Sequence, residues 1–379
     1  MQMPKNDKRK TILTVKDLLE KYLAGERSFA SVNLCNTDLQ NAQLAGIDLK
    51  QANLFRANLK NAVLAIANLS GADLVRANLI SARLDRSNLV RANLYEADLS
   101  DASLVSVNLS NAICSSANFS HVDLSQSNLS EANLSRTNLD RADLTQANLR
   151  EAILVKASLK QTILNRANLT EADLREADLS EAQLYLAVLS KANLSKANLS
   201  HANLDSANLF EAKLESSLFC HANLENTNLS QSFLMEANLT EANLRKANLS
   251  RANLTSAILS QANLLGANLS GSSLDRANLA GADCFGANLQ GANLSHANIE
   301  ATDLRESDLN KSNLAGANLA GANLFGAELL DANLAGANLA GANLYRTKLS
   351  GANLRGAYYD DLTEFSAKFD PKTKAMVKR

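Results

Sequence analysis

A leucine recurs at every fifth residue through most of the chain, and this period constrains the fold more than any other feature. From Leu34 to Leu354 there are 65 such positions, and 60 of them are Leu. The exceptions are Cys114, Phe119, Phe219, Cys284 and Ile299. Two residues before each of these centres stands Ala at 48 of the 65 sites, and neither column contains a charge. The residue between the two columns is usually Asn or Asp.

A five-residue period does not suit a helix, whose apolar face needs spacings of three and four. The triplet Ala-Asn-Leu instead alternates in, out and in, as an extended segment does. Two polar residues follow, so each pentapeptide is one short side plus one corner. Such a side cannot bury its Leu alone, whereas stacked copies share a continuous core. The sequence therefore predicts an all-β solenoid with coils about 4.8 Å apart.

The tandem pattern A(D/N)LXX, as in "ANLFRANLKNA" and "ADLVRANL", resembles the pentapeptide-repeat proteins. The resemblance covers residues 29–359 and implies a right-handed quadrilateral parallel β-helix with four pentapeptides in each coil. With 65 repeats, it implies about sixteen coils.

The remaining segments are expected to be a flexible N-terminus over 1–13, a helical cap over 14–28 and a C-terminal cap or tail over 360–379. The segment "TVKDLLEKYLA" changes to the period of an amphipathic helix. Thr14 and Asp17 fit a capping box, and Gly25 fits a helix stop. Phe365 and Phe369 are available to cover the last coil.

The segments at both ends of the repeats narrow the resemblance to one group within the family. The stretches "DLLEKYLAGERSF" and "YDD-T-F---FDP" are similar to cyanobacterial pentapeptide-repeat proteins, some of which act in the patterning of heterocysts. Ser366 stands where this pattern leads us to expect proline. The resemblance implies a regulator of heterocyst differentiation that binds another protein.

Charge and cysteine usage exclude several classes of protein. The chain balances 39 acidic against 38 basic residues, and no side gathers Lys and Arg into a stripe, so we expect no nucleic-acid partner. The alternative is a DNA mimic that inhibits or protects DNA gyrase, as some family members do, but mimicry needs a dense negative surface. No signal peptide or membrane-length apolar run is present, and the four cysteines are widely spaced, so we expect a cytoplasmic protein that does not enter a membrane.

A regular solenoid without insertions offers no pocket for catalysis, so we expect no enzyme, no cofactor and no metal. The spacing of two histidines leaves a metal-binding or enzymatic role as a second alternative. His201 and His221 are twenty residues apart, which places them one coil apart, and Cys220 precedes the second.

The first corner position, read every twenty residues, gives two rows of apolar side chains. The C-terminal row consists of Leu265, Phe285, Phe325 and Tyr345, and the N-terminal row of Phe55, Val75 and Tyr95, with Arg56 and Arg76 as a cationic rim. Contiguous apolar patches often mark binding sites. Each row is therefore a candidate surface for a protein partner, unless it serves only to tighten the solenoid.

The coil at each end of a solenoid has an unpaired backbone edge, which invites end-to-end association. We therefore expect a monomer or weak end-to-end association.

Overall fold

The computed structural model describes residues 13–379, so the flexible segment expected over 1–13 lies outside the described residues except for Leu13. The chain divides into two compact units. One extends to Asn168 and the other spans Leu169–Arg379. Each unit is described separately below.

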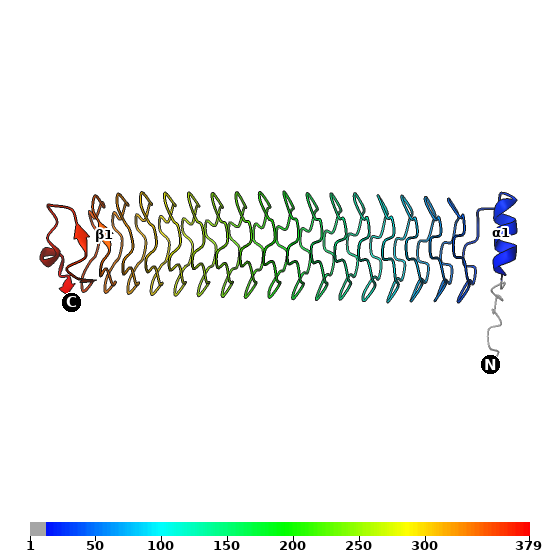
Figure 1. Cartoon of the computed structure of the whole chain (residues 1–379), viewed down its shortest axis with the longest axis horizontal. Coiled ribbons are helices and arrows are strands. Elements are labelled where there is room, and N and C mark those ends of the chain that lie inside the picture. The colour runs from blue at the N-terminus through cyan, green and yellow to red at the C-terminus, as the bar shows by residue number, and fades with distance from the viewer. Residues whose placement is uncertain (1–12) are drawn as a thin grey trace, which may run out of the picture. The chain divides into compact units, whose positions relative to one another are not determined.

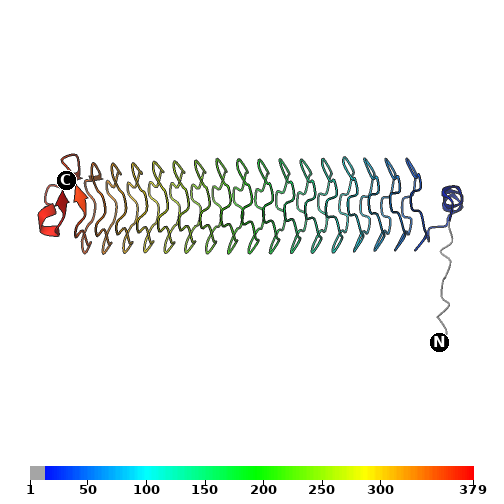
Figure 2. The ribbon, with the colours of Figure 1, turned by 90° about the horizontal axis from the view of Figure 1, so that it is seen from below.

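Each unit is a stack of coils whose backbones pair in parallel. Every bridge between repeats joins a residue to the one twenty positions later, as in Asn33 with Asn53 in the first unit and Asn313 with Asn333 in the second. Within each unit, successive coils repeat side by side in two perpendicular views (Figures 1 and 2). A step of twenty residues means that four pentapeptides complete one coil.

The sides of the coils are too short for ordinary strands. The N–H of Leu54 donates to the carbonyl of Asp73 at 2.7 Å, and the N–H of Asn53 donates to Val32 at 2.9 Å. Each side is only three residues long, so most pairing is limited to single bridges. In the described chain, two-residue strands occur only near the C-terminus: β1 Asn343–Leu344, β2 Tyr358–Tyr359, β3 Glu364–Phe365 and β4 Val377–Lys378.

Each corner is a tight turn with a left-handed residue in it. The N–H of Ala57 donates to the carbonyl of Leu54 at 2.9 Å, and Arg56 between them has a φ of +52°. A positive φ at this position is the mark of a type II turn. All fifteen glycines of the chain have positive φ, yet most corners place a non-glycine residue there at a cost of about 1–2 kcal/mol. Burial of the neighbouring Leu, which contributes about 1.5–3 kcal/mol, offsets this cost.

The core is the column of centres together with the small residues beside them. Leu204 and Ala202 are at most 1% exposed, which is typical of both columns. Where Thr or Ser replaces Ala, its hydroxyl usually bonds to a backbone carbonyl, as Thr227 does to Leu204 at 2.9 Å. Ser87 is an exception, because its buried hydroxyl has no hydrogen-bond partner among the described residues. The expected in-out-in alternation is therefore confirmed.

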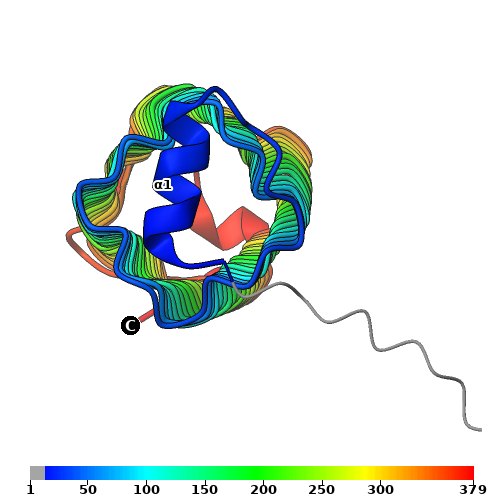
Figure 3. The ribbon, with the colours of Figure 1, turned by 90° about the vertical axis from the view of Figure 1, so that its right-hand side faces the viewer.

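Helix α1, Val15–Leu23, belongs to the first unit and lies across the end of its first coils (Figure 3). Thr14 and Asp17 form the expected capping box, and the chain leaves the helix through Gly25 at a φ of +97°. Leu18 is fully buried, and the Tyr22 hydroxyl donates to the carbonyl of Ala45 at 2.7 Å, which fastens the helix to the coils. The amphipathic spacing places Leu23 on the apolar face of this helix, but its side chain is exposed.

At the other terminus the repeat spacing changes. Strand β1 pairs with β3 at an offset of twenty-one residues, and β2 pairs with β4 at an offset of nineteen. The 3₁₀ helix η1, Pro371–Lys374, joins β3 to β4. The rings of Phe365 and Phe369 stack with their centroids 4.9 Å apart.

Candidate functional site

The coil geometry brings residues twenty positions apart into contact on the surface. Arg76 meets Glu96 at 2.5 Å in the first unit, and Lys191 meets Glu211 at 3.9 Å in the second. A surface column is therefore a set of side chains that share one corner of successive coils. A run of one chemical type along a column makes a continuous patch.

The C-terminal row lies in one such column of the second unit, where Arg305 stands between Phe285 and Phe325. Phe285 is 39% exposed and Tyr345 is 45% exposed, whereas Phe325 between them is half-buried. The rings of Phe325 and Tyr345 have centroids 6.0 Å apart and are tilted by 32°. This separation is typical of interacting aromatic pairs. Leu265, at the start of the row, is half-buried.

Two guanidinium groups lie over this row. Arg305 sits 5.4 Å from the Phe285 ring centroid, and Arg346 sits 5.6 Å from that of Phe325. Arg346 also lies 5.9 Å from the ring of Tyr345. Cation–π contacts at these distances stabilise the arrangement by about 0.5–1 kcal/mol each at exposed sites. The surface is therefore aromatic and cationic together.

Arg305 is held in place by a neighbouring carboxylate. Its Nε and Nη2 donate to Asp303 at 2.9 and 2.6 Å. The hydrogen bond from Arg305 lowers the pKa of the Asp303 carboxyl despite its partial burial. This bidentate pair fixes the guanidinium plane beside Phe285.

The backbone presents the aromatic residues outward in the same way each time. The N–H of Phe285 donates to Asp283 at 3.0 Å, and the N–H of Tyr345 donates to Asn343 at 2.8 Å. Gly286 follows Phe285 with a φ of +61°, and a Cβ there would meet nothing within 4 Å. The absence of a side chain at this corner leaves the Phe285 ring uncovered on that side.

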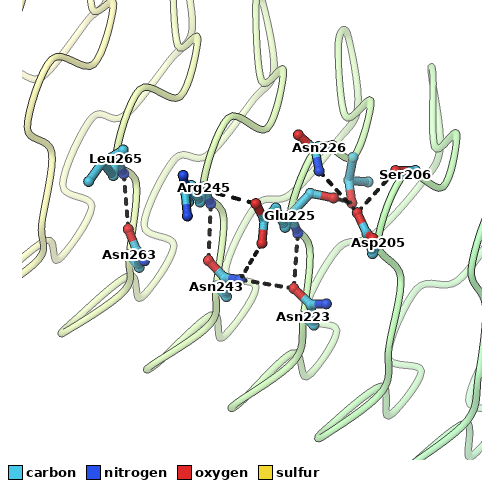
Figure 4. Close-up of polar contacts among 10 residues, drawn as sticks. Asp205, Ser206, Asn223, Glu225, Asn226, Asn243, Arg245, Asn263 and Leu265 are labelled. Atoms are coloured by element: carbon cyan, nitrogen blue, oxygen red, sulfur yellow. Dashed lines mark hydrogen bonds and ion pairs between the residues drawn. The ribbon is translucent and has the colours of Figure 1, made fainter.

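From Asp205 to Arg245 the same column is polar, although it begins with the exposed Tyr185. Asp205 accepts hydrogen bonds from Ser206 at 3.0 Å and Asn226 at 3.2 Å, and Glu225 pairs with Arg245 at 3.9 Å (Figure 4). These polar side chains bond to one another along the coils. The apolar segment therefore begins at Leu265 and does not run the length of the unit.

The N-terminal row is less exposed than expected. Phe55 and Val75 are half-buried, and Tyr95 is 40% exposed. Arg56 lies over the Phe55 ring at 5.1 Å. Arg76, expected as a second free cation on the rim, is instead bound to Glu96, and this hydrogen bond lowers the pKa of the Glu96 carboxyl. The expected rim is thus partly neutralised because the next coil supplies a carboxylate.

The two histidines meet as their spacing predicts. The rings of His201 and His221 stack with centroids 4.9 Å apart, and His221 Nδ1 lies 3.4 Å from Glu241. Cys220 is half-buried, and burial raises the pKa of its thiol. Among residues 13–379, no group of three or more His, Cys, Asp or Glu side chains is placed to hold a metal ion.

Several exposed apolar side chains lie outside the predicted rows, and two examples stand out. Ile66 is 66% exposed at a corner where its φ is +60°, a conformation that β-branched residues rarely adopt. Phe233 and Met235 flank one centre of the second unit and are both about two-fifths exposed. The sequence alone shows that Ile66 is unusual, because it is a β-branched residue at a corner position that otherwise holds mostly polar residues or glycine.

Comparison with known proteins agrees with the repeat geometry. The profile of the pentapeptide repeats, which describes eight copies of the repeat, matches overlapping segments from residue 28 to residue 356. The chain therefore belongs to the pentapeptide-repeat family. A comparison with curated proteins gives no significant match.

Several solved structures are similar to the chain. HetL, a pentapeptide repeat protein involved in heterocyst differentiation regulation from the cyanobacterium Nostoc sp. strain PCC 7120, is 28% identical over 91% of this chain and 96% of its own, with a TM-score of 0.17. Rfr23 from the cyanobacterium Cyanothece 51142 is 32% identical over 34% of this chain and 91% of its own, with a TM-score of 0.20. QnrB1, a plasmid-mediated fluoroquinolone resistance protein, is 20% identical over 44% of this chain and 84% of its own, with a TM-score of 0.35.

Within residues 13–379, no helix combines the length and the apolar character needed to cross a bilayer.

Proposed function

We propose that the protein is a non-catalytic scaffold that binds another protein through the C-terminal row. The observation that carries this proposal is the column in which Phe285 and Tyr345 are exposed and Phe325 is half-buried, with two guanidinium groups over its rings. Aromatic residues and Arg are enriched in protein interfaces, and Tyr and Arg are among the residues that contribute most to the binding energy. A fixed column of such residues is therefore suited to docking.

The proposed scaffold is the repeat region over 29–359, flanked by caps over 14–28 and 360–379. We take it to be a right-handed quadrilateral β-helix of about sixteen coils, as family membership implies. The N-terminal row, with Tyr95 as its most exposed member, is the second docking surface of the same proposal. We also propose a cytoplasmic location, on the basis of the sequence composition. A role in heterocyst differentiation is proposed from the resemblance of the two end segments to cyanobacterial proteins.

A paired pull-down tests the main proposal. One bait is the unaltered protein, and the other carries Phe285→Ser, Phe325→Ser and Tyr345→Ser. A matched control carries Phe233→Ser, Met235→Ser and Ile258→Ser, which remove exposed apolar side chains of the same unit away from the row. We expect a partner that the unaltered and control baits retain and the row variant loses, and this partner should then bind the purified protein directly.

Equal retention by all three baits would place the partner elsewhere and overturn the assignment of the row. Thermal melting of each bait separates loss of a surface from loss of the fold. A DNA gyrase supercoiling assay on the unaltered protein tests the alternative, since a DNA mimic inhibits or protects the enzyme and the proposed scaffold does neither.

A further inference from the structure

Leu349 is an exception within the leucine core. The other 64 centres between Leu34 and Leu354 are buried, but Leu349 is only half-buried. Thr347, which occupies the small-residue column beside it, is also half-buried. The change in pairing offset explains this, because the chain leaves the regular coil after Tyr359 and no further repeat covers that side. A core position thus faces an opening.

That opening is a cleft of about 280 Å³ between the last regular coil and the C-terminal segment. Its walls are mostly apolar, and the size is close to the lower end of the range for small-molecule sites. The lining residues are Leu344, Thr347, Leu349, Phe365, Ser366, Lys368, Phe369 and Lys374.

The apolar wall is fixed by ring stacking and by strand pairing. Phe365 stacks on Phe369 at 4.9 Å and meets Tyr359 edge-on at 5.7 Å. The pairing of β1 with β3 places Leu344 opposite Phe365. These contacts hold the cleft open beside Leu349 without filling it.

The charged groups of the lining are both positive. Lys368 and Lys374 are exposed, and neither ammonium forms an ion pair with a carboxylate of the described chain. No Asp or Glu of the described part of the chain lines the cleft. The nearby Asp370 is engaged as the cap of η1, where it accepts a hydrogen bond from the N–H of Lys372 at 3.0 Å.

The two hydroxyls of the lining each form one hydrogen bond. Thr347 Oγ1 donates to the carbonyl of Leu324 at 2.8 Å, and Ser366 Oγ accepts from the N–H of Arg346 at 2.9 Å, which leaves its O–H able to donate. The lysines are the charged groups of the lining that can meet a ligand. Their aliphatic stems extend the apolar wall while their ammonium groups stay in water.

We propose that this cleft binds an aliphatic monocarboxylate, with the chain against Leu349 and the phenylalanine pair and the carboxylate at Lys368 and Lys374. An apolar wall with a cationic edge complements an apolar tail that ends in a negative charge. The proposal is independent of the C-terminal row and of any protein partner.

Isothermal titration calorimetry of the full chain with octanoate tests this site. Acetate supplies the charge without the chain, octanol the chain without the charge, and octylammonium the chain with the opposite charge. We expect octanoate to bind at one site, octanol to bind more weakly, and acetate and octylammonium not to bind measurably.

The double variant Lys368→Gln, Lys374→Gln should weaken octanoate binding about tenfold or more, the scale of a lost charged contact. Lys372→Gln is the matched control, because Lys372 lies in the 3₁₀ helix η1 together with Lys374 but does not line the cleft. Leu349→Gln should also weaken binding while leaving the C-terminal segment in place. Circular dichroism checks that each variant keeps its fold.

The proposal is overturned if octanoate does not bind, if octanol binds as tightly, or if Lys372→Gln weakens binding as much as the double variant. Sedimentation of the unliganded chain provides a second check. Self-association that Leu349→Gln abolishes, without octanoate binding, would show that a second copy covers the cleft.

Discussion

The side-chain amide of Asn333 donates a hydrogen bond to the side-chain oxygen of Asn313, twenty residues earlier, at 2.9 Å. Asn313 in turn donates to Asn293 at 2.9 Å, and Asn353 donates to Asn333 at 3.0 Å. Asn313 Oδ1 also accepts from the N–H of Ala315 at 3.3 Å. The middle residue of the triplet therefore closes its own turn and ties it to the next coil, which explains the preference for Asn at this position.

Replacement of Asn313 by Ala should lower the unfolding free energy by about 1–2 kcal/mol, because three partly buried hydrogen bonds are lost. Asn313→Asp keeps both acceptor roles and loses only the donor, so its cost should be smaller. The midpoint of urea unfolding measures both. If the two variants are equally destabilised, the donor bond to Asn293 carries the whole effect and the acceptor roles are unimportant.

A second prediction concerns the core. Leu204→Ala should lower the unfolding free energy by about 2–5 kcal/mol, because Leu204 is fully buried and the coils on either side limit collapse of the cavity. Lys196→Ala, at an exposed corner of the same unit, should cost less than about 0.5 kcal/mol. Chemical denaturation of both variants makes the comparison. Similar losses would contradict the assignment of inward and outward positions.

Ile66 offers a test of backbone strain. A β-branched residue at a φ of +60° is strained, and exposure of the side chain means that its removal forfeits little burial. Ile66→Asn should therefore stabilise the first unit by about 1 kcal/mol, since Asn tolerates the left-handed region. Arg86→Asn, one coil further at the same corner and not β-branched, should change stability less. A lower melting temperature for Ile66→Asn would instead indicate that the isoleucine makes a stabilising contact.

The repeated part of the fold could be predicted because one leucine spacing enforces it at every coil. Exceptions arise where single residues break the pattern. The exposure of Leu349 follows from a change of pairing offset beyond the repeats, where no period exists to read. The engagement of Arg76 by Glu96 depends on side-chain rotamers that spacing alone does not give. The rows were predictable as columns, but their exposure was not, since Phe55 and Phe325 are half-buried while Phe285 and Tyr345 are not.

The last prediction concerns the pH dependence of the pair beside Phe285. The hydrogen bond from Arg305 lowers the pKa of Asp303 in the folded protein below its ordinary value of 3.8. A carboxyl with a depressed folded pKa contributes stability above its unfolded pKa and loses that contribution as the pH falls through the folded value. Asp303→Asn should therefore lower the melting temperature at neutral pH, and the difference from the unaltered protein should disappear below the folded pKa.

Melting curves recorded from neutral pH down into the acid range measure this difference. Asp101→Asn, at an exposed corner of the first unit where the carboxylate forms no ion pair within the described residues, is the control and should show little effect at any pH. Because the Asp303 pair also orients the guanidinium over Phe285, Asp303→Asn should weaken partner binding at neutral pH if the C-terminal row is the docking surface. Asn keeps an oxygen that can accept the turn hydrogen bond from the N–H of Arg305, so a difference in melting temperature that persists unchanged into acid would contradict the assignment of the effect to the charge of Asp303.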